Sequence, residues 1–160
     1  MEIDRLIHNI ERFDHYFDSV NNKSALYIAI NTFVTGGIIA IFNQKEFICN
    51  CHFTSYYSLG IALLLGVLSL IFLINTSIPY FSTKPDSLYY FGSISKIDKT
   101  LFFEKSISYT DEETLSDLRK QVYILSKGLT KKYRKLQVIG YLLILQFILL
   151  LPTIYLIIKT

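Results

Sequence analysis

Hydrophobic residues of this chain gather in three long blocks and do not alternate with polar ones. The blocks are residues 25–42, 59–78 and 138–158, and none contains a charged residue. A bilayer core about 30 Å thick is crossed by roughly 20 such residues in a helix. Three buried helices of a soluble domain are the alternative, but the remaining chain is too short to cover three apolar cylinders. The pattern therefore predicts an all-α membrane protein with three transmembrane helices.

An amphipathic stretch precedes the first block. In residues 1–24, apolar positions from Ile3 to Val20 recur at steps of three and four, which is typical of one helix face. We expect a helix that runs directly into the span, with a kink near Asn21-Asn22. A helix lying flat on the membrane is the alternative, but such helices usually have cationic polar faces and this one is rich in acids.

A second amphipathic stretch leads into the third block. Thr110 to Glu113 matches a capping box, in which the Thr hydroxyl and the Glu carboxylate satisfy free helix amides. From Leu115 to Leu136 apolar residues follow a heptad-like seam. The sequence thus predicts that two of the three spans continue amphipathic helices.

Lys and Arg are distributed unevenly around the blocks, and this predicts the orientation. Of the sixteen, three precede the first block and eleven lie between the second and third, whereas only Lys45 and Lys159 lie elsewhere. Positive residues in short loops mark the cytoplasmic side. We expect a cytoplasmic N-terminus and helical region 79–137, with loop 43–58 and the C-terminus in the periplasm. The net charge of +3 thus marks the membrane surface and does not indicate nucleic-acid binding.

No residues form a recognisable catalytic or metal-binding pattern. Cys49, Cys51 and His52 in the outer loop are one ligand short of a closed zinc site. A disulfide between the two cysteines would be strained. His8 and His15 are two helical turns apart, too far to share a metal within one chain. We therefore expect no enzymatic activity, no metal and no cofactor.

The spans contain amides but no ionisable residue. Transporters and proton pumps usually need charged groups at this depth, so that class is disfavoured. Amides and small residues recurring at four-residue steps allow close helix contact. The residues expected to pack helices in this way are Asn31, Thr32, Gly36, Ala40, Ala62 and Gly66. They fit either a hairpin of the first two spans or a homo-oligomer interface, and the pattern does not separate the two.

Three stretches resemble the transmembrane effectors of Pycsar antiphage defence, which are small bacterial inner-membrane proteins. The first is Asn22-Lys23-Ser24-Ala25, ahead of the first span, and the second is the aromatic run Tyr89 to Ile94. The third combines Asp117 to Leu125 with Lys131 to Leu136, ahead of the last span. Their order and spacing cover nearly the whole chain.

The resemblance implies that a partner cyclase makes a cyclic pyrimidine mononucleotide, cyclic CMP or cyclic UMP. The chain would bind it in the cytoplasm and then impair the inner membrane, causing abortive infection. Candidates to pair the phosphate are Lys23, Arg119, Lys132 and Arg134. Candidates to contact the base are Tyr89, Tyr90 and Tyr133 by stacking and Gln121 by hydrogen bonding. The alternatives are a non-sensing membrane anchor or interaction protein, and an effector gated by a different cyclic nucleotide or oligonucleotide.

Overall fold

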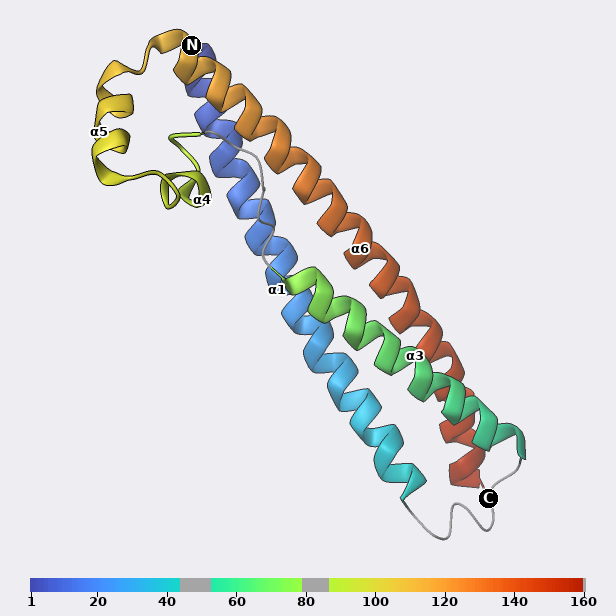
Figure 1. Ribbon diagram of the computed structural model, residues 1–160. Helices are drawn as coiled ribbons and strands as arrows, with labels where there is room; N and C mark the ends of the chain where they lie inside the picture. Colours follow the sequence, from blue (N-terminus) through green and yellow to red (C-terminus); the bar gives the residue numbers. More distant parts are fainter. Residues whose placement is uncertain (44–52, 79–86, 160) are drawn as a thin grey trace. The chain divides into compact units, whose positions relative to one another are not determined.

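Helices make up almost all of the described part of the chain, residues 1–43, 53–78 and 87–159 of the computed structural model (Figure 1). They are α1 (Glu2–Phe42), α3 (Phe53–Ser77), α4 (Phe91–Ile94), α5 (Lys99–Ser108) and α6 (Asp111–Lys159). Three of them, α1, α3 and α6, are long and apolar enough to cross a membrane. The predicted all-α membrane fold is therefore confirmed.

Two of these helices are much longer than a bilayer requires. α1 has 41 residues and α6 has 49, whereas about 20 suffice to cross the hydrocarbon core. Each therefore joins an amphipathic segment to an apolar one without interruption, as predicted. α1 is unbroken at Asn21 and Asn22, where the sequence predicts a kink.

The second span begins earlier than its apolar block indicates. The expected outer loop is 43–58, but α3 starts at Phe53 and not at Leu59. These first turns contact the rest of the bundle through Ser58, whose hydroxyl lies 2.8 Å from that of Thr153. Cys49 and Cys51 lie outside the described residues.

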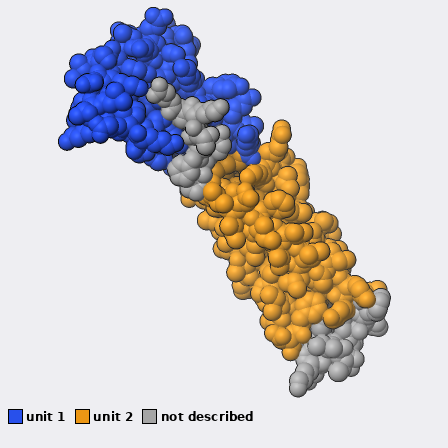
Figure 2. Space-filling view, in the orientation of Figure 1, with its two compact units in different colours: residues 1–19, 79–131 blue, residues 20–78, 132–160 orange. Residues whose placement is uncertain are grey.

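The chain divides into two compact units, coloured separately in Figure 2. Unit 1 comprises Met1–Ser19 and Pro79–Lys131, and unit 2 comprises Val20–Ile78 and Lys132–Thr160. The unit boundaries thus lie within α1 and α6, several residues before the membrane boundaries expected from the sequence.

Unit 2 is a three-helix bundle with two apolar clusters inside it. Cluster A contains Ile38, Leu59, Ala62 and Leu150, and cluster B contains Leu73, Ile139 and Leu143. The outer faces are apolar as well; they include Phe33, Leu64, Ile74 and Leu151 among the exposed residues. Exposed apolar surface on this scale is avoided by soluble monomers and is suited to lipid. The bundle therefore has the surface of a membrane domain.

Gly66 lets three polar side chains approach α3 between the two clusters. Asn31 Nδ2 donates to the Gly66 carbonyl at 2.9 Å, and Thr35 Oγ1 donates to Asn31 Oδ1 at 3.0 Å. A Cβ on Gly66 would overlap Thr35 Oγ1 and would lie 2.6 Å from Gln146 Nε2. The missing side chain at this position is therefore what allows the three helices to meet here.

The structure separates the six predicted packing residues into two groups. Asn31, Ala62 and Gly66 are buried inside unit 2, whereas Thr32, Gly36 and Ala40 are exposed. The hairpin interpretation is therefore wrong for these last three, since α1 packs through the neighbouring positions Asn31, Thr35 and Ile38. An oligomer interface at the exposed group stays a prediction.

We predict that Gly66→Ala destabilises the bundle, because the new Cβ overpacks a site with no room. The expected loss is about 1–3 kcal/mol in the free energy of unfolding, measured by denaturant titration in detergent. Gly36→Ala is the matched control, since no atom of another part of the chain lies within 4 Å of a Cβ there. Equal loss in both variants would contradict this account of Gly66.

Candidate functional site

Asp117 organises the polar interior of unit 1. This carboxylate is only 3% exposed, and its Oδ2 accepts hydrogen bonds from Ser87 Oγ at 2.8 Å and from the Leu88 backbone N–H at 3.1 Å. The Tyr109 hydroxyl also donates to it, at 3.5 Å. A buried carboxylate is costly unless hydrogen bonds replace its water. Asp117 therefore fixes residues on both sides of α4 and α5 against α6.

Two helix caps position the segment that carries Tyr109. Asp98 caps α5 by accepting from the Thr100 N–H at 3.1 Å. At the start of α6 the predicted capping box is present: Glu113 Oε2 accepts from the Thr110 N–H at 2.9 Å, and Thr110 Oγ1 accepts from the Glu113 N–H at 3.3 Å. Hydrogen bonds from Thr110 lower the pKa of the Glu113 carboxyl. Tyr109 therefore sits on a short connection between two capped helices.

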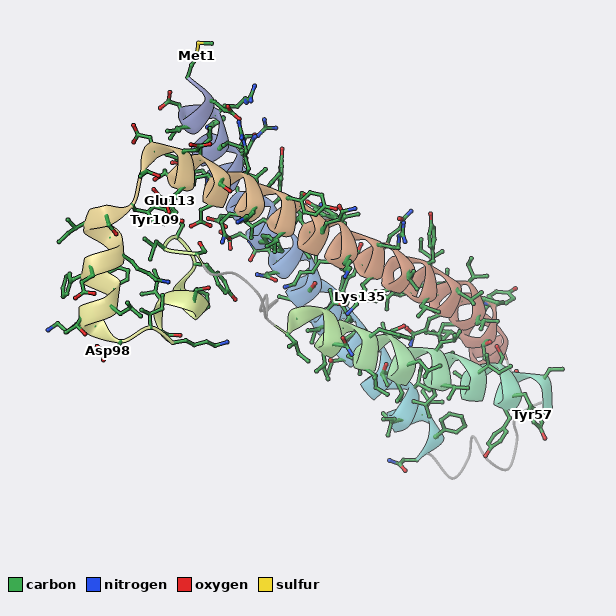
Figure 3. All side chains as sticks on the ribbon, turned by 45° about the horizontal axis from the view of Figure 1, so that its top comes forward. Met1, Tyr57, Asp98, Tyr109, Glu113 and Lys135 are labelled. Carbon is green, nitrogen blue, oxygen red and sulfur yellow. The ribbon has the colours of Figure 1, made fainter. Side chains whose placement is uncertain are left out.

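A hollow of about 330 Å³ lies beside Asp117, within unit 1. Its wall includes Lys105 from α5, Tyr109, and Glu113, Asp117 and Lys120 from α6. The three α6 residues are spaced by four and three positions, which places them on one helix face. Tyr109 and Glu113 lie close together at the start of α6 (Figure 3). The volume falls at the lower end of small-molecule sites, roughly 300–1,000 Å³.

Charged groups of both signs line this hollow. Lys105 and Lys120 provide two ammonium groups, and Glu113 and Asp117 provide two carboxylates. Both carboxylates accept hydrogen bonds from the chain itself. The formal charge of the wall is therefore balanced, and its ammonium groups are of the kind that suits a phosphate oxygen.

The eight predicted ligand residues are divided between the two units. Tyr89, Tyr90, Arg119 and Gln121 belong to unit 1, whereas Lys23, Lys132, Tyr133 and Arg134 belong to unit 2. None of the eight lines the hollow. No single site within either unit contains all of them.

Arg119 is engaged by another part of unit 1. Its guanidinium forms a two-point contact with the Glu2 carboxylate, with Nε–Oε1 and Nη2–Oε2 both 2.9 Å. This contact lowers the pKa of Glu2, chiefly through the hydrogen bond, and raises the pKa of Arg119. Arg119 therefore joins the start of α1 to α6.

Gln121 is 6% exposed, and its Nε2 has no hydrogen-bond partner among the described residues.

The aromatic run after the second span forms a compact local cluster. The Tyr90 and Phe91 rings lie 5.1 Å apart, centroid to centroid. A Cβ on Gly92 would lie 2.6 Å from the Tyr90 ring, so this glycine makes space for the ring. Tyr89 is exposed. In this arrangement Gly92 makes room for the Tyr90 ring, and Tyr89 and Phe91 are both exposed to solvent.

The predicted cations of unit 2 differ in their environments. Lys132 is buried and its Nζ donates to Asn21 Oδ1 at 3.3 Å. Burial lowers its pKa, and the neighbouring Lys135 lowers it further. Lys23 and Arg134 are exposed. These positions agree with a membrane-flanking role, in which cations extend toward the interface.

The sequence did not single out Lys105, Tyr109 and Lys120, which line the hollow. Part of the signal was present, because Glu113, Asp117 and Lys120 follow the capping box on one helix face. What the sequence does not show is that Ser87 and Tyr109 come to Asp117 across thirty and eight positions of the chain.

A comparison with protein families decides the class of this chain. The family model described as the Pycsar effector protein domain matches residues 5–159. The chain belongs to this Pycsar effector family. The resemblance read from the sequence is thereby confirmed, and the match includes the hollow of unit 1 and all three apolar helices. No match was found among curated proteins or among solved structures. Membership identifies an antiphage effector linked to a cyclic-nucleotide signal and to the membrane.

We predict that Asp117→Asn loosens the hollow of this Pycsar effector. All three donors bond to Oδ2. An uncharged amide oxygen accepts more weakly than this carboxylate oxygen, so the expected loss in the free energy of unfolding is about 1–3 kcal/mol. Hydrogen–deuterium exchange should show faster exchange of the Leu88 amide, because its contact with residue 117 is weakened. The unfolding temperature of the detergent-solubilised protein should also fall. Glu112→Gln, at an exposed position of the same helix, is the control. Unchanged protection of Leu88 would contradict the role of Asp117.

A second prediction concerns pH and the Glu2–Arg119 contact. The folded pKa of Glu2 lies below its ordinary value of 4.5. Its contribution to stability is therefore complete above about pH 4.5 and is lost as the pH falls through the lower folded value. Glu2→Gln should lower the unfolding temperature above that pH, and the difference from the wild type should vanish on acidification. Glu11→Gln is the control; a difference that persists unchanged at low pH would argue against the ion pair.

Proposed function

We propose that this effector binds a cyclic pyrimidine mononucleotide, cyclic CMP or cyclic UMP, in the hollow of unit 1, and that the occupied form impairs the bacterial inner membrane. The observation that carries the proposal is the position of the hollow on α6. Lys120 and Asp117 line it, and the same unbroken helix continues into an apolar span.

The ligand's chemistry fits the residues of the wall. A cyclic mononucleotide has one phosphate charge, a ribose hydroxyl and a flat base. Lys105 and Lys120 pair with the phosphate, the Tyr109 ring stacks on the base, and the Ser108 and Ser116 hydroxyls reach the ribose. A pyrimidine is the smaller kind of base, which suits a hollow of about 330 Å³. The proposal places the ligand on these wall residues, and a role for the eight residues predicted from sequence stays a prediction.

Binding acts on the membrane through helix α6. A ligand shifts an equilibrium only if it binds one arrangement more tightly than the other. Contacts to Lys105 on α5 and Lys120 on α6 depend on how these two helices lie, so the ligand selects one arrangement of unit 1. α6 then transmits that arrangement to unit 2 by covalent continuity. In this proposal unit 1 is cytoplasmic, where a cyclase delivers its product, and the C-terminus is periplasmic.

The test is a binding panel on the full-length protein in detergent, followed by leakage from liposomes containing it. Cyclic CMP, cyclic UMP, cyclic AMP and cyclic GMP are compared by calorimetry. Nucleotide-dependent leakage with one of the two pyrimidines supports the proposal. Binding of only a purine nucleotide assigns another messenger, and a protein that shows neither binding nor leakage is left as an anchor or interaction protein. Either result overturns it.

We predict that Lys105→Met and Lys120→Met each weaken nucleotide binding. A hydrogen bond to a charged group contributes about 1.5–3 kcal/mol, which corresponds to roughly tenfold or more in Kd. Lys96→Met, an exposed cation of unit 1 outside the hollow, is the matched control and should bind as the wild type does. Arg119→Met tests the phosphate role predicted from sequence. A large loss in Arg119→Met or Lys96→Met, with none in the two wall lysines, would move the site elsewhere.

A further inference from the structure

Gln146 is a polar side chain without partners at the centre of the apolar bundle. It is 0% exposed, and neither Oε1 nor Nε2 has a hydrogen-bond partner in the described part of the chain. Ser69 Oγ is buried and unpartnered in the same sense. An unmade hydrogen bond of this kind costs about 1–3 kcal/mol, and a bilayer core supplies no water to relieve it. The cost of leaving these buried groups without hydrogen bonds calls for an explanation. One explanation is that they find partners in another conformational state of the protein.

The unpaired groups belong to a polar layer, by which we mean Asn31, Thr35, Gly66, Ser69 and Gln146. Gln146 Nε2 and Thr35 Oγ1 both approach the position that a Gly66 Cβ would occupy, and Asn31 Oδ1 is 3.3 Å from it. The α1 members are already paired, Asn31 with the Gly66 carbonyl and Thr35 with Asn31. All three helices thus place amide or hydroxyl groups at one level of the bundle.

The polar layer is enclosed by the two apolar clusters. Along α6 the order is Leu143 of cluster B, then Gln146, then Leu150 of cluster A. Along α3 the same clusters are reached at Leu73 and Ala62, with Gly66 between them.

Polar pairs recur beyond both clusters. Ser58 and Thr153 lie past cluster A, with their hydroxyls 2.8 Å apart. Past cluster B, Lys135 Nζ donates to Asn75 Oδ1 at 3.0 Å on the exposed surface of the bundle, and Lys135 is labelled in Figure 3. A polar pair thus lies past each cluster, the first partly buried and the second at the surface.

We infer that the polar layer lines a conduit for water and small ions, which clusters A and B keep shut in the resting protein. Apolar constrictions close pores by excluding water. When the spans separate, water enters the layer and provides the partners that Gln146 and Ser69 lack. Because the layer has amides and hydroxyls and no charge, it passes small ions of either sign. This inference rests on the proposed function and states how the membrane is impaired.

The experiment uses full-length protein in liposomes and measures the flux of potassium and chloride after adding cyclic CMP or cyclic UMP. Gln146→Leu removes the polar lining and should lower the flux at least tenfold, with nucleotide affinity unchanged. Gln146→Met is a second variant that preserves the side-chain length. Gln137→Leu makes the same substitution at an exposed position of α6 and should conduct as the wild type does. Leu73→Asn places an amide in cluster B and should give flux without nucleotide.

The outcomes separate the inference from the proposed function. A wild type that binds the nucleotide but never leaks defeats the proposed function. A wild type that leaks, with Gln146→Leu and Gln146→Met leaking equally, defeats the conduit and leaves general bilayer damage. Release of a large trapped dye together with the ions also contradicts a conduit, whereas ion flux without dye release supports it.

Discussion

A bilayer core contains no water, so each polar group placed in it must find a partner within the protein. This constraint determines most of unit 2. Its helices satisfy their own backbones, their outer faces are apolar, and the polar side chains of Asn31 and Thr35 bond to each other and to a backbone carbonyl. Gly66 is required because only a residue without a Cβ leaves room for that arrangement. Against this background Gln146 and Ser69, which have no side-chain partner among the described residues, are the exceptions.

Unit 1 adds polar contacts to the apolar seams of its helices. Asp117 gathers three donors, the Thr110–Glu113 box begins α6, and Arg119 binds Glu2 of α1. Such contacts are individually modest and depend on position. They determine which residues of the loops before α4 and after α5 lie against α6.

The sequence was sufficient for the spans and insufficient for the site. Lipid imposes a length and an absence of charge, so 59–78 and 138–158 are recognisable without any knowledge of neighbours. Which face of α1 meets protein was not recognisable, because Thr32 and Gly36 on one face resemble Asn31 and Thr35 on the next, and the lipid face is apolar too. The capping box was found because it is local.

The hollow could not be predicted from the sequence because the residues that form it lie far apart along the chain. Ser87 and Asp117 are thirty residues apart, and no periodicity relates them. Basic and aromatic residues are common near a membrane surface. The presence of Arg119 and Tyr89 there therefore does not by itself identify a ligand site. Lys105, on the last turn of a ten-residue helix, carried no distinguishing pattern. Lys105 becomes a wall residue of the hollow only because α5 packs beside α6.

The unpaired amide of Gln146 also affects how much binding free energy the ligand must supply to open the bundle. Reversing a two-state equilibrium from 1:99 to 99:1 requires a differential affinity of about 5.5 kcal/mol. If Gln146 stays unpaired only in the resting state, its cost of about 1–3 kcal/mol already favours the open state. The apolar clusters oppose opening, since their side chains would meet water. The resting protein is then closed by a small margin, and two charge-assisted contacts to a phosphate, at about 1.5–3 kcal/mol each, are of the size needed to reverse it.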